Sequence, residues 1–266
     1  MKPIKTVYYT DPLNDEFSGN KIERRPLPKN YKYVHRNIFY RAAAWFVYYL
    51  ILYPIAVIIY RLFLHYKVVG NKRIKGIMNK PVFFYGNHTT MWDAGIAQFL
   101  ASRGKRTYII TNQDTTSIKG IRWLVSMLGA IPIPENAEQR AKFVDCLKYR
   151  VKQKCGISIF PEAHIWPYST HIRPFKDDSF VYPAECGAPV VAMCTTYRER
   201  RFRKNKPPLP VVHISKPFFP DMSKSLTQRK QELRAQVYDY LVDVAGSAEN
   251  VEYISYVRKK EEGGGQ

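Results

Sequence analysis

Residues 82–93 read VFFYGNHTTMWD, and this stretch decides how the rest of the chain is interpreted. The run Val82–Tyr85 is apolar and predicts a buried strand, and the polar residues from Gly86 to Thr90 predict a loop behind it. Trp92–Ser102 then predicts a helix. A strand that leads through a polar loop into a helix is the repeating unit of an α/β domain, in which ligands bind at the carboxyl ends of the strands.

The same alternation continues toward the C-terminus. Further strands are predicted at Thr107–Thr111, Ala130–Ile133, Gly156–Phe160, Pro189–Thr196 and Pro210–Ile214, and further helices at Ile118–Leu128, Ala137–Gln153 and near Leu226–Val244. Strands that alternate with helices indicate a mostly parallel central sheet flanked by helices. We therefore expect one α/β domain over residues 67–258, followed by a disordered tail at residues 259–266.

The segment before this domain divides into two parts. Residues 1–35 are rich in Lys, Arg, Asn and Pro and predict a basic N-terminal arm, whereas residues 36–66 contain an uncharged run of 19 residues, AAAWFVYYLILYPIAVIIY, from Ala42 to Tyr60. At about 1.5 Å per residue, a helix of this length nearly matches a hydrocarbon core of roughly 30 Å. A single membrane span, a half-inserted helix or a helical hairpin bent at Pro54, and a helix in a soluble core all remain open. Membrane contact is the firmest expectation for this segment.

The charge balance also bears on partners. The chain of 266 residues carries 42 Lys and Arg against 22 Asp and Glu, a formal net charge of +20. Such an excess attracts polyanions, either nucleic acid or anionic lipid. The uncharged segment has no role in nucleic-acid binding, so we expect membrane lipids and no nucleic acid as partners. The four cysteines lack paired or metal-ligand spacing, which favours reduced thiols of the cytosol. Together with the apolar segment, this leads us to expect a membrane-associated protein whose active site faces the cytoplasm.

His88 and Asp93 form the first candidate site, in the loop after the first strand. If His88 lies in the turn and Asp93 in the first turn of the helix, the carboxylate can reach back to one imidazole nitrogen. It would then fix the tautomer and leave the other nitrogen free as a general base. The alternative is a capping turn, in which Thr89 or Thr90 is the N-cap and Asp93 complements the helix dipole.

A second candidate site follows the strand that ends at Phe160. Pro161 stiffens the exit from this strand, and Glu162 and His164 follow in the loop. Further on, Arg173-Pro174-Phe175-Lys176 places two cations beside an aromatic ring, which suits an anionic group or a lipid surface. An exposed turn and a solvated loop are the alternatives, and a lone histidine is more often structural than catalytic.

Several motifs in order make these loops more informative. NHTTMWD, LGAIPI, FPEAH, RPFK and GAPVV follow one another along residues 67–215, and this order resembles the 1-acyl-sn-glycerol-3-phosphate acyltransferase family. The resemblance implies acyl transfer from a thioester, acyl-CoA or acyl carrier protein, to a glycerolipid hydroxyl, with no metal and no cofactor beyond that co-substrate. It also implies that His88 is the base and Asp93 its orienting partner. Substrate-binding residues are expected among Asn87, Pro161, Glu162, His164, Arg173 and Lys176.

The chain departs from the family pattern at two arginines. The arginine of the second block falls at Glu135, and in the third block FPEGTR has become FPEAHI, with Ile165 in place of arginine. The family arginines are expected to bind the acceptor's phosphate, because a planar guanidinium matches that group. Arg140, Lys142, Arg173, Lys176 or His164 would replace them, or the acceptor lacks that phosphate.

These features together predict a membrane-bound O-acyltransferase of phospholipid biosynthesis, acting on a glycerolipid such as 1-acylglycerol-3-phosphate. Two alternatives remain open. One is an acyltransferase for an acceptor without phosphate. The other is a catalytically silent relative that binds lipid or acyl carrier protein.

Overall fold

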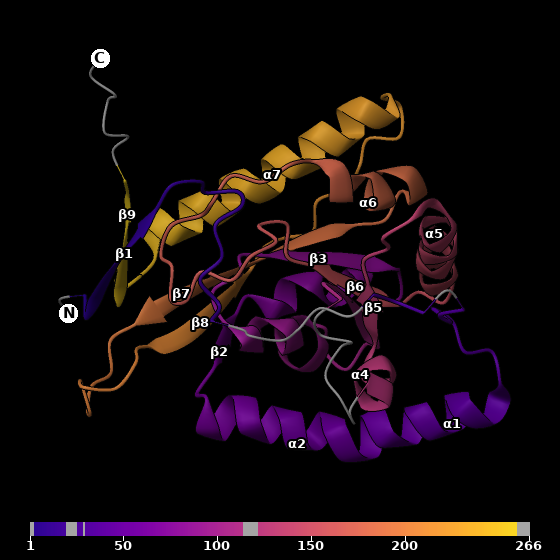
Figure 1. The fold of residues 1–266 in the computed structure, drawn as a ribbon, viewed down its shortest axis with the longest axis horizontal. Helices are drawn as coiled ribbons and strands as arrows, with labels where there is room; N and C mark the ends of the chain where they lie inside the picture. Colours follow the sequence, from indigo (N-terminus) through magenta and orange to yellow (C-terminus); the bar gives the residue numbers. More distant parts are fainter. Residues whose placement is uncertain (1–2, 20–25, 29, 114–121, 260–266) are drawn as a thin grey trace.

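The computed structural model describes residues 3–19, 26–28, 30–113 and 122–259. Its centre is a seven-stranded sheet with the strand order β2-β8-β7-β3-β6-β4-β5, and a second sheet pairs β1 with β9 (Figure 1). The strands are β1 (Lys5–Tyr9), β2 (Lys67–Val69), β3 (Val82–Gly86), β4 (Thr107–Thr111), β5 (Ala130–Pro132), β6 (Gly156–Ile159), β7 (Val190–Arg198), β8 (Leu209–Ile214) and β9 (Ile254–Arg258).

Helices cover both faces of the central sheet (Figure 1). They are α1 (Ile38–Phe46), η1 (Val47–Leu52), α2 (Tyr53–Ile58), η2 (Ile59–Phe63), η3 (Asn71–Ile77), η4 (Met91–Gly95), η5 (Ile96–Ala101), α4 (Arg122–Leu128), α5 (Ala137–Lys152), η6 (Asp178–Phe180), α6 (Val181–Cys186) and α7 (Leu226–Ser247). One apolar cluster joins the sheet to α5, α6 and α7, and a second joins it to η3, η5 and Tyr60 of the N-terminal helix. Burial on both faces explains why β3 is apolar throughout its length.

The predicted fold class, a mixed α/β fold with a mostly parallel sheet, is confirmed. Adjacent strands from β7 to β5 pair in parallel, but β8 runs antiparallel to β7. The chain from β7 to β8 is too short for the helical crossover that a parallel pair requires. Of the helix predicted at Ile118–Leu128, the structure describes Arg122–Leu128 as α4, and residues 118–121 lie outside the described part of the chain.

The N-terminal arm contains a strand that pairs with the C-terminal part of the chain, whereas the sequence predicted the arm as a separate segment. β1 pairs in parallel with β9, from Lys5 opposite Ile254 to Tyr9 opposite Arg258, and the amide of Lys259 donates to the carbonyl of Tyr9 at 2.8 Å. Residues 1–35 and residues 67–258 therefore share a sheet. The predicted disordered tail lies outside the described residues from residue 260 onward.

The uncharged segment forms one helix, Ile38–Phe63, which is long and apolar enough to cross a membrane by length and composition. It continues through Pro54 without a reversal, so the hairpin alternative is wrong. Only Tyr48 and Tyr60 are buried along this helix, and large apolar side chains such as Phe39, Leu50 and Leu62 are exposed. That exposure does not fit a helix in a soluble core.

Candidate active site

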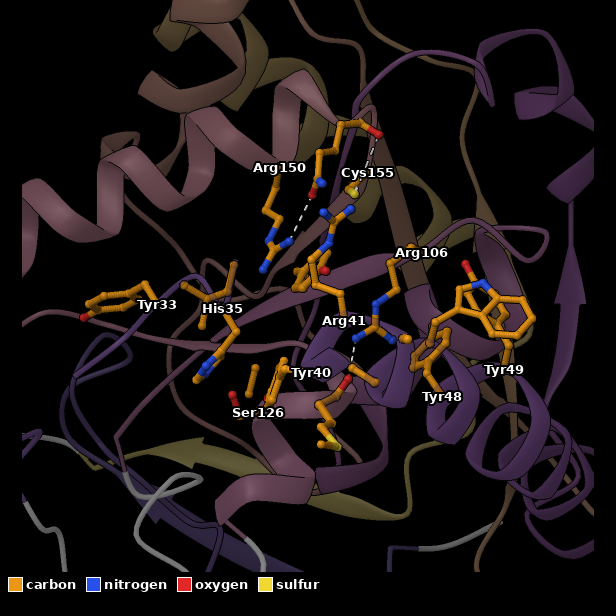
Figure 2. A pocket seen from close by; sticks show the side chains of 18 of the residues that line it. Tyr33, His35, Tyr40, Arg41, Tyr48, Tyr49, Arg106, Ser126, Arg150 and Cys155 are labelled. Carbon is orange, nitrogen blue, oxygen red and sulfur yellow. Dashed lines mark hydrogen bonds between the residues drawn. The ribbon is translucent and has the colours of Figure 1, made fainter. Parts of the chain in front are cut away.

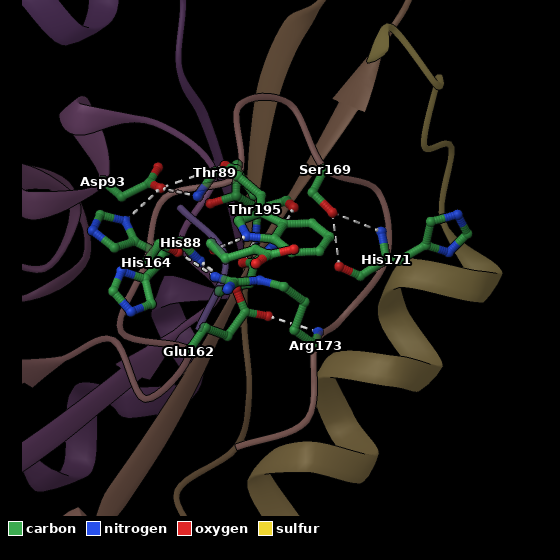
Figure 3. A network of polar contacts seen from close by, with 12 residues as sticks. His88, Thr89, Asp93, Glu162, His164, Ser169, His171, Arg173 and Thr195 are labelled. Carbon is green, nitrogen blue, oxygen red and sulfur yellow. Dashed lines mark hydrogen bonds and ion pairs between the residues drawn. The ribbon is translucent and has the colours of Figure 1, made fainter. Parts of the chain in front are cut away.

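The polar residues predicted after β3 and β6 meet at the carboxyl edge of the sheet (Figure 3). Asn87 holds the start of the first loop to the neighbouring strand: its side-chain nitrogen donates to the carbonyl of Thr195 at 3.0 Å, and its oxygen accepts from the amide of Thr195 at 2.8 Å. Asn87 is 2% exposed. Because both bonds go to the backbone of β7, Asn87 fixes the position at which His88 leaves the sheet.

His88 and Asp93 lie together at this loop, as the sequence predicted. The distance from His88 Nδ1 to Asp93 Oδ2 is 3.3 Å, and Asp93 is fully buried. The imidazole stacks on the ring of Phe160, with centroids 4.6 Å apart, and its side chain remains 16% exposed. Its Nε2 forms no hydrogen bond with the described residues. Asp93 thus holds one nitrogen of the imidazole, and the other nitrogen is without a partner in the described part of the chain.

Asp93 also caps the helix in whose first turn it lies. Its Oδ2 accepts from the amides of Thr89 at 2.6 Å and Thr90 at 2.7 Å, and its Oδ1 accepts from the hydroxyl of Thr90 at 3.1 Å. The contact with His88 and the capping contacts, which the sequence offered as alternatives, are therefore made by the same carboxylate. Charge-assisted bonds to two amides hold this carboxylate in place, so it orients His88 from a rigid position.

Glu162 and Arg173 form a buried ion pair beneath His88. The distance from Arg173 Nη2 to Glu162 Oε2 is 3.1 Å, and the two side chains are 3% and 2% exposed. Glu162 also accepts from the amide of His88 and from the amide of Arg173, each at 3.0 Å. Burial raises the pKa of Glu162, while Arg173 and the two amides act in the opposite direction. Both oxygens of Glu162 are thus occupied, and its carboxylate fixes the backbone of the His88 loop.

The N-terminal arm covers the loop that follows Glu162. Trp166 donates from its indole nitrogen to the carbonyl of Asp15 at 2.7 Å and stacks on Tyr256 of β9. His164 Nδ1 lies 3.6 Å from a carboxylate oxygen of Glu16. Nothing in the local sequence of residues 1–35 indicates this contact, because it depends on the pairing of β1 with β9.

Two comparisons with known proteins bear on this arrangement. Residues 65–196 match the Acyltransferase family model. Residues 65–196 belong to the Acyltransferase family. The fold resembles the crystal structure of the 1-acyl-sn-glycerophosphate (LPA) acyltransferase PlsC from Thermotoga maritima, with a TM-score of 0.56 and 18% identity over 83% of this chain and 87% of that chain. No curated protein sequence matches the chain significantly. Both matches support the family resemblance seen in the motifs.

The acyltransferase domain brings some predicted substrate-binding residues to His88 and leaves others away. Asn87, Glu162 and His164 lie in the loops around it, and Pro161 joins Phe160 to Glu162. Lys176 is exposed, and its ammonium has no polar partner among the described residues.

Arg173 of the acyltransferase domain is not available for a phosphate. Its guanidinium faces Trp166 at 4.8 Å, pairs with Glu162 and donates to the carbonyl of His164. Among the other cations that the sequence offered as replacements, Lys142 pairs with Glu138 on α5 at 2.6 Å. The structure therefore does not supply Arg173 or Lys142 as a substitute for the missing family arginines.

Proposed function

We propose that this chain is a membrane-bound O-acyltransferase that moves a fatty acyl group from a thioester donor, acyl-CoA or acyl carrier protein, to a glycerolipid hydroxyl. The observation that carries the proposal is the His88 imidazole, whose Nδ1 is held by buried Asp93 while Nε2 is free. Membership of residues 65–196 in the Acyltransferase family supports the reaction class. The PlsC structure that shares the fold is of an enzyme for a lysophosphatidate acceptor.

In the proposed reaction, Nε2 of His88 accepts the proton of the acceptor hydroxyl as its oxygen attacks the thioester carbonyl. Asp93 stabilises the imidazolium that forms. The tetrahedral intermediate collapses, the carbon–sulfur bond breaks, and the imidazolium returns its proton to the leaving thiolate. The products are an ester and a free thiol. General-base help of this kind contributes about 10²–10⁴ in rate.

Glu162 has a positioning role in this scheme. Its oxygens are bound to Arg173 and to the amide of His88, so it acts on the acceptor through the loop it fixes. Pro161 precedes it, and His164 is the residue of this loop whose ring reaches Glu16 of the arm. We therefore place His164, rather than Glu162 or Arg173, at the acceptor.

The residues of the loop after β6 bear on which acceptor the enzyme uses. Ile165 stands where the family has arginine, and Arg173 is bound to Glu162. These two observations favour an acceptor without a phosphate at this position over 1-acylglycerol-3-phosphate. The test compares 1-acylglycerol-3-phosphate with 1-acylglycerol as acceptors. Ile165→Arg is expected to shift the kcat/KM ratio toward the phosphate-bearing acceptor by about tenfold, because a charge-assisted contact contributes about 1.5–3 kcal/mol.

Membrane binding is proposed from the exposed apolar helix Ile38–Phe63 and its connection to the site. Trp92 is 41% exposed, and its ring meets that of Tyr60 at 6.1 Å, while the Tyr60 hydroxyl donates to the Trp92 carbonyl. Asp93 is the next residue. The helix is thus tied to the turn that holds the catalytic pair, which would place the site at the lipid surface. The free cysteines of the described chain suit a site that faces the cytoplasm.

The decisive experiment incubates the purified full chain with labelled acyl-CoA or acyl carrier protein and a panel of glycerolipid acceptors. His88→Ala is expected to lower turnover by about 10²-fold or more. His171→Ala is the matched control, because it removes an exposed imidazole whose side chain points away from His88 (Figure 3). Transfer by His88→Ala at the wild-type rate would overturn the assignment of the base. Absence of labelled product with wild type across the panel would favour the catalytically silent relative.

A further inference from the structure

A cavity of about 510 Å³ lies at the other edge of the sheet, at the amino ends of β4 and β6 (Figure 2). Arg106 immediately precedes β4, Cys155 immediately precedes β6, and both line the cavity. The remaining wall comes from α5, the end of α4, the start of β5, the first turns of the N-terminal helix and the segment that precedes this helix. None of its lining residues belongs to the His88 network, so the cavity is separate from the proposed active site.

The lining of this cavity is cationic and aromatic. It includes Arg41, Arg106, Arg150 and His35 together with several tyrosines, and no Asp or Glu of the described chain lines it. In the described residues none of these three arginines pairs with a carboxylate. This contrasts with Arg173, which is buried with Glu162. The cavity thus carries positive charge that the described residues do not neutralise.

The guanidinium groups are held in a way that leaves hydrogen-bond donors unused. Arg106 lies over the ring of Tyr48 at 3.6 Å, and Arg150 lies over the ring of Tyr108 at 4.1 Å. Stacking on a ring occupies the face of a guanidinium and leaves its N–H edge free.

Each of these two arginines makes one hydrogen bond at that edge. Arg106 Nη2 donates to the carbonyl of Met127, and Arg150 Nη1 donates to Gln153 at 3.0 Å. Arg106 Nη1 and Arg150 Nε are buried without a partner among the described residues. A buried donor left unpaired costs about 1–3 kcal/mol, so an anion that accepts from both would recover that energy.

The pKa of His35 is sensitive to the positive charge of this cavity. Its ring stacks on Tyr40 with centroids 4.1 Å apart, and its pKa is lowered by burial, by Lys32 and by Arg150. A bound anion would offset the two cations. The pKa of His35 is therefore a local measure of whether an anion occupies the cavity.

We propose that this cavity is a binding site for a phosphate ester with an apolar portion. The phosphate accepts from Arg106 and Arg150, and the apolar portion packs against the tyrosines and against Ile38 and Trp45 of the N-terminal helix. Trp45 is 57% exposed on the same helix that we place at the lipid surface. The headgroup of a membrane phospholipid and a soluble phosphate ester share this chemistry.

The test measures equilibrium binding to the full chain in neutral detergent, with three probes: dihexanoylphosphatidate, dihexanoylglycerol and phenyl phosphate. Arg150→Gln is expected to weaken binding of the phosphate probes by about tenfold or more, because it removes a charge-assisted hydrogen bond. Arg106→Gln removes the neighbouring guanidinium, and Arg150→Gln carries the test if that variant does not fold. Arg201→Gln is the matched control, because it removes an exposed arginine from the β7–β8 connection.

If phenyl phosphate binds and Arg150→Gln weakens its binding, the proposal is supported and the ligand is a soluble phosphate ester. If only dihexanoylphosphatidate binds and Arg150→Gln weakens its binding, the proposal is supported and the ligand is a lipid headgroup. In either case His88→Ala leaves the affinity unchanged, and ring NMR of His35 shows its pKa rising on saturation. The proposal is overturned if dihexanoylglycerol binds as tightly as dihexanoylphosphatidate, if neither phosphate probe binds, or if Arg150→Gln and Arg201→Gln weaken binding equally.

Discussion

Arginines lie at both the carboxyl edge and the amino edge of the central sheet, but the contacts of these arginines differ between the two edges. At the carboxyl edge Arg173 is 3% exposed and paired with Glu162, which in turn binds the amide of His88. At the amino edge Arg106 and Arg150 stack on tyrosine rings and have no carboxylate partner among the described residues. An arginine with an internal partner builds a rigid site, whereas an arginine without one attracts an anion from outside.

This difference separates two ways of using charge in one fold. In the network of His88, Asp93, Glu162 and Arg173 the buried guanidinium is neutralised by Glu162, whose carboxylate also holds the amide of His88. The amino-edge cavity has no carboxylate among its described lining residues to neutralise its arginines. Substitutions that remove one member of each set should therefore have different consequences for activity, folding and binding.

The largest expected effect is on catalysis by Asp93→Asn. An amide in place of this carboxylate cannot stabilise the imidazolium of His88, so kcat should fall by about 10²–10⁴-fold in the acyl-transfer assay. Thr90→Val is the matched control, because it removes only the hydroxyl that bonds Asp93 Oδ1 and keeps the amide that bonds Oδ2, the oxygen that contacts His88. A loss as large in Thr90→Val would show that the cap, and not the contact with His88, limits the rate.

Arg173→Met is expected to have the next largest effect, on stability. Removing one partner of a buried ion pair leaves Glu162 uncompensated and costs about 3–5 kcal/mol. Denaturant unfolding of the purified chain measures this loss. A change below about 1 kcal/mol would mean that Glu162 is adequately stabilised by its two amide donors alone.

Arg150→Met is the counterpart of that substitution at the amino edge. It removes a guanidinium that has no carboxylate partner, so the free energy of unfolding should change by no more than about 1 kcal/mol, mainly through the lost stacking on Tyr108. The same denaturant experiment applies. If Arg150→Met destabilises the chain as much as Arg173→Met, the two edges do not differ in the way described above.

The smallest expected effect concerns a strained residue at each edge. Ala163 has φ 63° and Lys154 has φ 56°, both in the left-handed region. Glycine relieves a cost of about 1–2 kcal/mol there but adds about 0.4–1 kcal/mol of unfolded-state freedom, so each substitution should stabilise by roughly 0.5 kcal/mol. Ala163→Gly should also alter the KM for the acceptor, and Lys154→Gly should not. Equal KM values for the two variants would show that the loop containing Ala163 does not contact the acceptor.

The local part of the fold could be predicted from sequence. Val82–Tyr85 followed by a polar loop indicated β3 and the site beyond it, since a buried strand and a loop each have a local signature. The proximity of His88 and Asp93 followed from a turn that leads into a helix. Residues on one loop need only local geometry to meet, and the order of several motifs added the family.

The rest depended on contacts between distant segments. β1 and β9 are short, lie near opposite ends of the chain and carry no alternation that distinguishes them from neighbouring loops. The pairing of Arg173 with Glu162 also could not be read from spacing, because RPFK predicts an exposed cation as readily as a buried one. The cavity between the N-terminal helix and α5 likewise requires the packing of elements that sequence places far apart.

The parallel pair formed by β1 and β9 has a consequence for the order of assembly. β1 precedes every strand of the central sheet along the chain and β9 follows all of them, so this two-stranded sheet cannot form until the whole central sheet has been synthesised. Tyr256 of β9 and Asp15 near β1 both contact Trp166. The loop behind Glu162 therefore gains its cover only after every strand of the central sheet is available for folding.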